Sequence, residues 1–240
     1  METAAGLLNS IGLDNDGLKC LSNTTCRIFE FSVPHHSQYC RKSEEDFLWM
    51  AERLNDAAID AIELNVSCPN VSGGVDFGTD PVLCHKVVAR FARSLVIRFG
   101  QKLTPNVTDI RVAAKAAAEG GRGRGVSDQH AARDGCQLGK QKPMLGNVVG
   151  GLSGPAIKPV ALRCVHQIAQ AVKIPIVGIG GIANLDDVME FLVAGASAVQ
   201  IGTANFYDPT VSVRILDQLP AAIESLGYHS VQEVTGTLRT

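Results

Sequence analysis

Apolar and polar positions along the chain predict short strands that alternate with amphipathic helices. Strand candidates are short apolar runs, and helix candidates place apolar residues three or four positions apart on one face. The expected strands are 61–67, 94–103, 174–181 and 197–206, and the expected helices are 43–54, 108–119, 158–172, 184–195 and 209–226. Apolar strands that alternate with helices predict a parallel sheet covered on its faces.

The glycines of the C-terminal half help to separate two architectures for such a sheet, a doubly wound sheet and a (β/α)8 barrel. Glycines close two consecutive strands, in GIGG at 178–181 and in IGT at 201–203, and a predicted helix follows each. Glycine lets backbone N–H groups approach a phosphate, and the last two strands of a barrel commonly carry such a site. The pattern favours the barrel, with two tight turns and no ligand as the alternative.

Composition narrows the classes of protein to which the chain can belong. The 240 residues are 45% hydrophobic and 19% charged, which is typical of a globular protein. The net charge of −2 argues against a general nucleic-acid surface. No apolar run reaches the length of a membrane span, and no secretory pattern is present. The seven cysteines lack metal-ligand and disulfide spacing, so we expect a cytoplasmic protein without a metal site.

The segment ELNVSCPN, residues 63–70, is the sharpest chemical feature of the chain. A predicted strand ends there in Asn65, Ser67, Cys68 and Asn70. Amide side chains both donate and accept hydrogen bonds, which suits a planar, amide-rich ligand. A loop cysteine whose thiolate is favoured acts as a base or a nucleophile. A small buried side chain is the alternative for Cys68, and the residues alone leave both interpretations open.

Two further positions are weaker candidates. Lys102 lies at another predicted strand end, in QKLTPN, where a solvated charge is the alternative to a contact with a flavin. Asn9 precedes a glycine turn in LNSIGL, residues 8–13, where an ordinary loop is the alternative. Neither position identifies a ligand by itself.

Six segments together resemble the dihydroorotate dehydrogenases, in that family's order along nearly the whole chain. They are ETAAGLLNSIGLDNDG, ELNVSCPN, KLTPNVTDI, GGLSGPAIKPVALR, VGIGGI and VQIGTANF. The resemblance implies an α/β fold, the FMN-binding (β/α)8 TIM barrel. It also implies oxidation of dihydroorotate to orotate, with FMN as the hydride acceptor, in pyrimidine biosynthesis.

Two of these regions, SCPNVSGG and GGLSGPAIKP, are most similar to the class 1B catalytic subunits of that family. Class 1B implies that electrons pass to NAD through an iron–sulfur partner subunit, which carries FAD and a 2Fe-2S cluster. It also implies a homodimer at the core of a heterotetramer. We therefore expect this partner, and neither nucleic acid nor membrane.

The resemblance assigns roles to particular residues. Cys68 would be the base that takes a proton from dihydroorotate while a hydride passes to the flavin. Asn65 would contact flavin and substrate, Asn70 would contact substrate, and Lys102 would contact the flavin ring. The ribityl phosphate would be held by Gly154, Gly180, Gly181, Gly202 and Thr203, and the orotate site would be lined by Asn9, Ser10, Ile11, Gly12 and Leu13.

Compared with the family pattern, we expect the barrel to begin well before Met1. Roughly 60–70 residues, about two of the eight β/α units, have no counterpart in this sequence. Residues 1–240 are therefore predicted to form one partial barrel domain that lacks the family's first β/α units. No residue here matches the family's lysine that meets both flavin and substrate.

Two segments, 24–42 and 121–139, depart from the family pattern. The stretch GRGRGVSDQHAARDGCQLG, 121–139, has no apolar period, whereas the family has a buried strand at this place. Permitted codons for it, read one base later, encode GADGVSLINTLRGMAVNL. In the same way PHHSQYCRK, 34–42, yields PIIANIAG. We hypothesise that both segments are out-of-frame translations, and we expect them to be irregular or poorly packed.

Two other functions stay open at this point. A doubly interrupted product would fold poorly or bind flavin without turnover, because each polar group without a partner in the core costs about 1–3 kcal/mol. A related flavin barrel would act on another pyrimidine, such as uracil.

Overall fold

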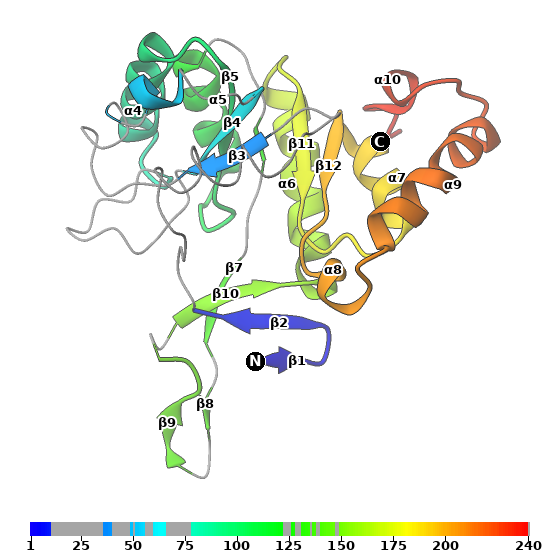
Figure 1. The fold of residues 1–240 in the computed structure, drawn as a ribbon, viewed down its shortest axis with the longest axis horizontal. Helices are drawn as coiled ribbons and strands as arrows, with labels where there is room; N and C mark the ends of the chain where they lie inside the picture. The colour runs from blue at the N-terminus through cyan, green and yellow to red at the C-terminus, as the bar shows by residue number, and fades with distance from the viewer. Residues whose placement is uncertain are drawn as a thin grey trace. The chain divides into compact units, whose positions relative to one another are not determined.

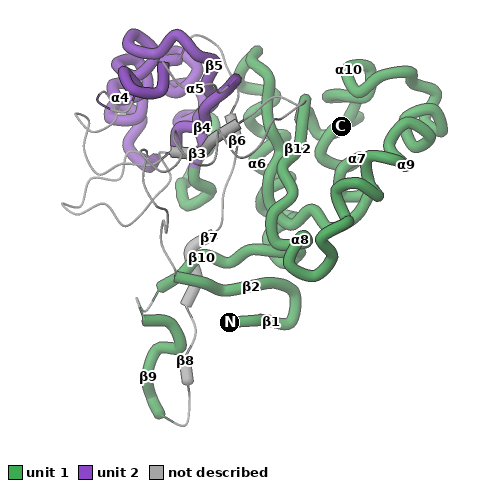
Figure 2. Tube along the Cα trace, viewed as in Figure 1, with its two compact units in different colours: residues 1–10, 104–111, 127–240 green, residues 11–103, 112–126 purple. Residues whose placement is uncertain are grey.

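A computed structural model describes residues 1–10, 36–39, 49, 51–55, 60–65, 78–121, 126–127, 131–134, 136–137, 140–146 and 149–239. The chain divides into two compact units, coloured separately in Figure 2. Unit 1 comprises Met1–Ser10, Thr104–Arg111 and Ser127–Thr240, and unit 2 comprises Ile11–Leu103 and Val112–Val126.

Parallel strands form the sheet of unit 2 (Figure 1): β3 (His36–Tyr39), β4 (Ala61–Asn65) and β5 (Arg98–Lys102). The strand β4 pairs with both of the others. Its apolar residues Ile62 and Leu64 are fully buried, and the intervening Glu63 and Asn65 are buried as well. Burial on both faces is characteristic of a strand inside a parallel sheet.

The helix α4 (Pro81–Ser94) packs an apolar face into the core of unit 2. The ring of Phe91 in α4 contacts the ring of Phe99 in β5 edge-on, with centroids 5.5 Å apart. Phe91 is fully buried, and edge-to-face aromatic pairs add stability beyond the area that they bury. The predicted helix 43–54 is confirmed at residues 51–54, where Ala51 and Leu54 are fully buried.

The helix α4 was not predicted, although the chain carries a signal for it. Asp80 is the N-cap, and its side chain accepts hydrogen bonds from the backbone N–H groups of Val82 and Leu83. Pro81 occupies the first helical position, where its missing N–H has no consequence. An Asp-Pro pair before a run with apolar residues on one face therefore predicts a helix start.

Unit 1 contains the β/α pattern that the sequence predicts for the C-terminal half. In chain order its elements are α6 (Lys158–Ala171), β11 (Ile176–Ile179), α7 (Leu185–Ala194), β12 (Ala198–Gln200) and α9 (Val211–Ser225). Strands β11 and β12 pair in parallel. The helix α7 begins after the predicted cap Asn184 and ends at Gly195, because a capping box satisfies its first N–H groups and the C-cap glycine has φ 124°. The predicted elements that correspond to α6, β11, α7 and α9 are confirmed.

Further elements of the described chain are η3 (Pro155–Ile157), α5 (Ile110–Gly120), α8 (Ala204–Tyr207), α10 (Val231–Val234), β6 (Val126–Ser127), β8 (Cys136–Gln137) and β9 (Lys142–Pro143). The helix α5 confirms the predicted helix 108–119 to within two residues. Strands β8 and β9 pair antiparallel.

An antiparallel sheet in unit 1 was not predicted. It contains β1 (Glu2–Thr3), β2 (Gly6–Asn9), β10 (Val149–Ser153) and β7 (Ala131–Asp134). The strand β10 pairs with β2 at Ser153↔Leu7 and Gly151↔Asn9, and with β7 on its other side. These partners are far apart in the chain, so no local pattern specifies the pairing.

One prediction about a strand is wrong. The segment 197–206 is not one buried strand, because β12 covers only Ala198–Gln200, Ala198 is exposed, and Ala204–Tyr207 is the helix α8. Within the segments 24–42 and 121–139, which we expect to be irregular or poorly packed, the structure describes the short strands β3 in the first and β6, β7 and β8 in the second; the packing of these segments stays a prediction. Backbone pairing with a neighbouring strand is available to polar residues too, which is why polarity alone did not exclude these strands.

Candidate active site

The loop after β10 lies directly against the loop after β12. Gly154 follows β10 with φ 88°, a conformation that side chains rarely adopt. A Cβ placed on it would lie 2.7 Å from the Cα of Gly6 and 3.4 Å from the Cγ2 of Thr203. The backbone of Gly154 therefore packs on β2 and beside Thr203, so two of the predicted phosphate residues are neighbours.

The glycine pair after β11 lies against the first turn of α6. Gly181 has φ 77°, and a Cβ on it would lie 2.6 Å from the backbone N of Lys158. A Cβ on Gly180 would lie 2.9 Å from the Cβ of Ala161, on the same helix. Any residue larger than glycine would push the turn away from the helix, so the sequence GG is a packing requirement at this place.

The loop after β12 is more open. A Cβ on Gly202 would meet no atom within 4 Å. Next to it, Asn205 donates a hydrogen bond from Nδ2 to the carbonyl oxygen of Ile201 at 2.8 Å, which closes the start of α8. The loop after β11 thus packs on the start of α6, and the loop after β12 lies beside Gly154 in the loop after β10.

A charged cluster lies at the same end of α6. Lys158 Nζ is 2.6 Å from Asp187 Oδ1 and 3.0 Å from Glu190 Oε2. The hydrogen bonds that the Lys158 ammonium donates to Asp187 and, with a smaller effect, to Glu190 raise its pKa above the ordinary value. Sequence reasoning missed Lys158 and Asp187, because they are 29 residues apart and no local pattern around either residue indicates the other as its partner.

In unit 2, two predicted residues are paired across adjacent strands. Asn65 ends β4 and Lys102 ends β5, and they are partners in the parallel register. Both are buried, with 2% and 5% exposure. Lys102 Nζ forms an ion pair with Glu63 Oε1 at 3.0 Å, so a carboxylate that sequence reasoning missed neutralises this ammonium. An amide and an ammonium therefore lie together at the carboxyl ends of β4 and β5.

The remaining predicted residues fall into two groups. Asn9 ends β2 opposite Gly151 of β10, and both Asn9 and Ser10 are half-buried. The other predicted substrate and catalytic residues lie outside the described residues; they are Ile11, Gly12, Leu13, Cys68 and Asn70. Asn9, Ser10 and the glycines belong to unit 1, whereas Asn65 and Lys102 belong to unit 2.

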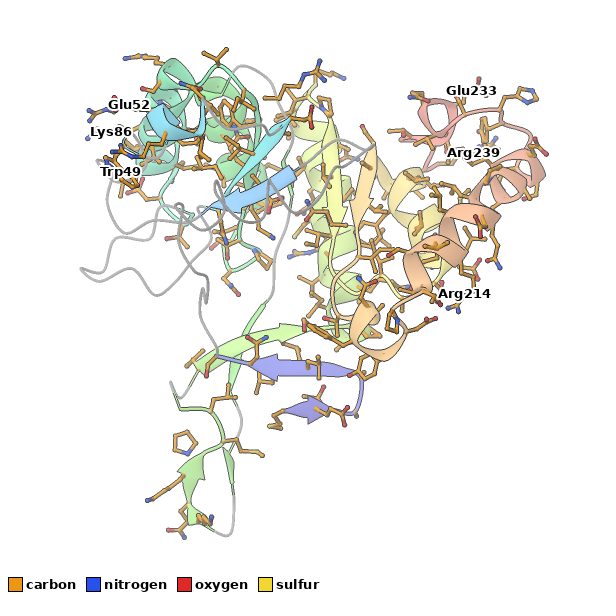
Figure 3. All side chains as sticks on the ribbon, viewed as in Figure 1. Trp49, Glu52, Lys86, Arg214, Glu233 and Arg239 are labelled. Carbon is orange, nitrogen blue, oxygen red and sulfur yellow. The ribbon has the colours of Figure 1, made fainter. Side chains whose placement is uncertain are left out.

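The described residues offer neither a metal site nor a membrane-spanning helix. Among the described residues no group of three or more His, Cys, Asp or Glu side chains is arranged to hold a metal ion. No described helix is both long and apolar enough to cross a membrane. The surface carries ordinary ion pairs, such as Arg214 on α9, labelled in Figure 3, with Asp208 at 2.6 Å.

Comparisons with known proteins agree on one family. The family model described as dihydroorotate dehydrogenase matches residues 1–223. A protein of Bacillus pumilus named dihydroorotate dehydrogenase B (NAD(+)), catalytic subunit, is 43% identical over 238 residues, which are 98% of this chain and 77% of that protein. A protein of Listeria monocytogenes with the same name is 41% identical over 236 residues, 97% of this chain and 78% of its own length.

A solved structure has the same fold. The crystal structure of DHODH from Eimeria tenella, in complex with ferulenol, superposes with a TM-score of 0.69. The match covers 82% of this chain and 58% of that chain, at 21% sequence identity. At this identity the likeness shows the fold alone, and it confirms the predicted α/β fold of the TIM-barrel kind.

Proposed function

Because this chain belongs to the dihydroorotate dehydrogenase family, we propose that it oxidises dihydroorotate to orotate in pyrimidine biosynthesis. The names of its relatives point to the NAD-linked form B of the enzyme and to the role of catalytic subunit. The chain spans about three quarters of the length of these relatives, 77% and 78%.

The cofactor that we propose is FMN, which when bound accepts the hydride. The observation that carries this proposal is the packing of the glycine-bearing loops in unit 1. Glycine at 154 and 181 lets these loops pack on Gly6 and on Lys158, and a Cβ at Gly202 would meet no atom within 4 Å, so the backbone of the loop after β12 has room for a phosphate. The residues that would hold the phosphate are Gly154, Gly180, Gly181, Gly202 and Thr203.

From the family resemblance, we propose that Lys102 and Asn65 contact the ring of the flavin. The ammonium of Lys102 would stabilise negative charge at the pyrimidine edge of the ring. Asn65, its register partner, would donate and accept hydrogen bonds to flavin and substrate. The buried Glu63 would orient the Lys102 side chain through the ion pair at 3.0 Å.

Cys68 is the proposed base, on the strength of the family resemblance of ELNVSCPN. Its thiolate would take a proton from one carbon of dihydroorotate as a hydride leaves the neighbouring carbon, so that the ring C=C bond of orotate forms. Asn70 and the segment Asn9, Ser10, Ile11, Gly12 and Leu13 would orient the substrate.

Replacement of the thiol tests this proposal. Cys68→Ala is expected to lower turnover per bound FMN by about 100- to 10,000-fold, because a positioned base contributes that much. The measurement is the bleaching of flavin absorbance on addition of dihydroorotate. Cys84→Ala is the matched control, since Cys84 is a buried core cysteine and its loss should leave turnover per FMN unchanged.

Two outcomes would contradict the proposal. Wild-type turnover in Cys68→Ala would exclude the thiol as the base. Faster turnover with dihydrouracil than with dihydroorotate would move the chain to another pyrimidine substrate.

The relatives' designation as catalytic subunits supports a partner subunit. We propose that this partner carries FAD and a 2Fe-2S cluster, passes electrons to NAD, and joins a homodimer of this chain in a heterotetramer. Analytical ultracentrifugation with and without the co-expressed partner would test this composition.

We also propose that segments 24–42 and 121–139 are out-of-frame translations within one partial barrel domain. The strand β3 supports the first case. It reads HSQY, yet it pairs in parallel with the buried strand β4, and the alternative frame supplies the apolar sequence PIIANIAG there. Resequencing the coding DNA would test this directly, and an uninterrupted frame would contradict it.

A further inference from the structure

The carboxylate of Asp187 joins two elements of unit 1. Its Oδ1 accepts a hydrogen bond from Lys158 Nζ at 2.6 Å, at the start of α6. Its Oδ2 accepts hydrogen bonds from the backbone N–H groups of Ala183 at 2.8 Å and Asn184 at 3.2 Å, at the end of the loop after β11. One carboxylate therefore ties the GGIAN loop to the helix that follows the loop after β10.

Lys158 contacts this loop at a second point. Its backbone N lies where a Cβ on Gly181 would come within 2.6 Å, so the main chain of Lys158 packs on the glycine turn. The side chain of Lys158 forms an ion pair with Asp187, which lies six residues after Gly181 in the chain. The loop is thus held to α6 at both ends, once by close packing and once by the ion pair.

The surroundings distinguish this cluster from an ordinary surface ion pair. The Asp187 side chain is 8% exposed and the Lys158 side chain 27%. Asp187 also belongs to the capping box of α7, in which its own N–H donates to Asn184 Oδ1 at 2.9 Å. A buried carboxylate that accepts hydrogen bonds from one ammonium and two backbone N–H groups fixes the geometry of the backbone around it.

The charges of the cluster exclude a direct role as an anion ligand. The single ammonium of Lys158 is shared by Asp187 and Glu190, so the cluster carries a net negative charge. A phosphate placed on it would meet two carboxylates. The cluster can therefore assist a phosphate site only by holding the backbone that forms it.

We propose that Lys158 and Asp187 are positioning residues, which hold the Gly180–Gly181 turn against α6 and thereby set the affinity for the phosphate of FMN. This inference rests on the proposed FMN site. The effect that it predicts is selective, because Lys158 and Asp187 contact the loop after β11, which is assigned to the phosphate. Its loss should weaken the binding of FMN and leave the binding of riboflavin, which lacks the phosphate, nearly unchanged.

Titration of the full chain with FMN and with riboflavin, followed by flavin fluorescence, tests the inference. Lys158→Met is expected to lower the affinity for FMN by about tenfold or more, because a displaced loop no longer places its N–H groups on the phosphate. Riboflavin affinity should change by less than about twofold. Lys158→Arg, which keeps the charge and reaches both carboxylates, should recover most of the FMN affinity.

Two further variants separate positioning from general damage. Arg111→Met removes an ion pair of similar length in the same unit, with Asp109 at 2.7 Å, and should leave both affinities unchanged. Glu190→Gln should have little effect, because Asp187 still accepts from Lys158. Thermal unfolding of each flavin-free variant reports on the fold independently of ligand; if Lys158→Met does not fold, Asp187→Asn is titrated in its place with the same expected loss.

The outcomes are distinguishable. An unchanged ratio of FMN to riboflavin affinity in Lys158→Met, beside a wild type that prefers FMN, would overturn the positioning role and leave the proposed function in place. A wild type that binds FMN no better than riboflavin would overturn the proposed phosphate site, and the positioning role with it.

Discussion

Burial governs the chemistry of the cysteines that the structure describes. Cys84 and Cys164 are both buried, in α4 and α6. Desolvation, with a smaller contribution from the charge of Asp80, raises the pKa of the Cys84 thiol from 9.0 to about 12. Such a thiol is a neutral core group and a poor nucleophile. A catalytic base such as the one proposed at Cys68 needs the opposite environment, in which the thiolate is favoured.

Stability at alkaline pH should reveal the Cys84 thiol. Its folded-state pKa is raised, so its contribution to stability is complete below pH 9.0 and is lost as the pH rises toward 12. Over this range the unfolded chain releases the proton while the folded chain retains it. Urea denaturation across the range should show a steeper decline in the free energy of unfolding for the wild type than for Cys84→Ala. Parallel declines would contradict the shifted pKa.

The ion pair between Lys102 and Glu63 should be costly to break on one side. Both side chains are almost fully buried, at 7% and 5% exposure. Lys102→Met is expected to lower the free energy of unfolding by about 3–5 kcal/mol, because the Glu63 carboxylate loses its counter-ion in the core. The double variant Lys102→Met, Glu63→Leu should be more stable than Lys102→Met alone. Chemical denaturation measures the free energy of unfolding of both variants. A double variant less stable than Lys102→Met would contradict the expected cost of the unpaired Glu63 carboxylate.

Among the elements, helices with local start signals are the most self-sufficient. The helix α7 carries a capping box at its start and a glycine at its end, and α4 begins with a capping aspartate followed by proline. Strands are different, since β3, β4 and β5 each depend on a neighbour for their backbone hydrogen bonds. This explains why predicted helix bounds agree with the structure more closely than predicted strand bounds.

The cap of α4 offers a test at this scale. Asp80→Ala removes the acceptor for the N–H groups of Val82 and Leu83, at 2.8 and 3.2 Å. The expected loss in the free energy of unfolding is about 0.5–2 kcal/mol for Asp80→Ala. Asp80→Ser should retain most of the wild-type stability, because serine also caps helices. Urea denaturation of the three proteins measures the difference. Equal stability of the alanine and serine variants would show that the cap bonds contribute nothing.

For the molecule as a whole, the out-of-frame hypothesis bears on how much apolar side-chain area the strands can bury. The segments 24–42 and 121–139 contain strands whose printed residues, such as HSQY in β3, are polar. Polar strands give a parallel sheet little apolar area to bury, and hydrophobic burial is the dominant favourable term in folding.

Restoring the alternative frame should therefore stabilise the protein. A chain in which PIIANIAG and GADGVSLINTLRGMAVNL replace the corresponding printed residues is expected to unfold at a higher urea concentration and to retain more FMN through gel filtration than the printed chain. The absorbance of bound flavin per protein measures the second effect. A restored chain with lower stability and no gain in flavin would contradict the hypothesis. Turnover by the restored chain alone would identify the printed one as an interrupted product.

The sequence by itself determined the features that neighbouring residues encode. The apolar stripe of α6, the caps of α7, the strand β11 with its glycine turn, and the family motifs are local patterns. They sufficed for the α/β fold and for the reaction, which the comparisons bear out. The individual site residues stay predictions, and Cys68 among them lies outside the described residues.

Tertiary structure alone decided which distant groups meet. The ion pairs of Asp187 with Lys158 and of Lys102 with Glu63 join different elements, and the pairing of β2 with β10 joins opposite halves of the chain. Local propensity carries no information about such partners, because a side chain finds its counter-charge only after the backbone has placed both. A motif can therefore predict that glycine turns bind a phosphate, whereas the carboxylate that holds one of those turns is visible only in the folded chain.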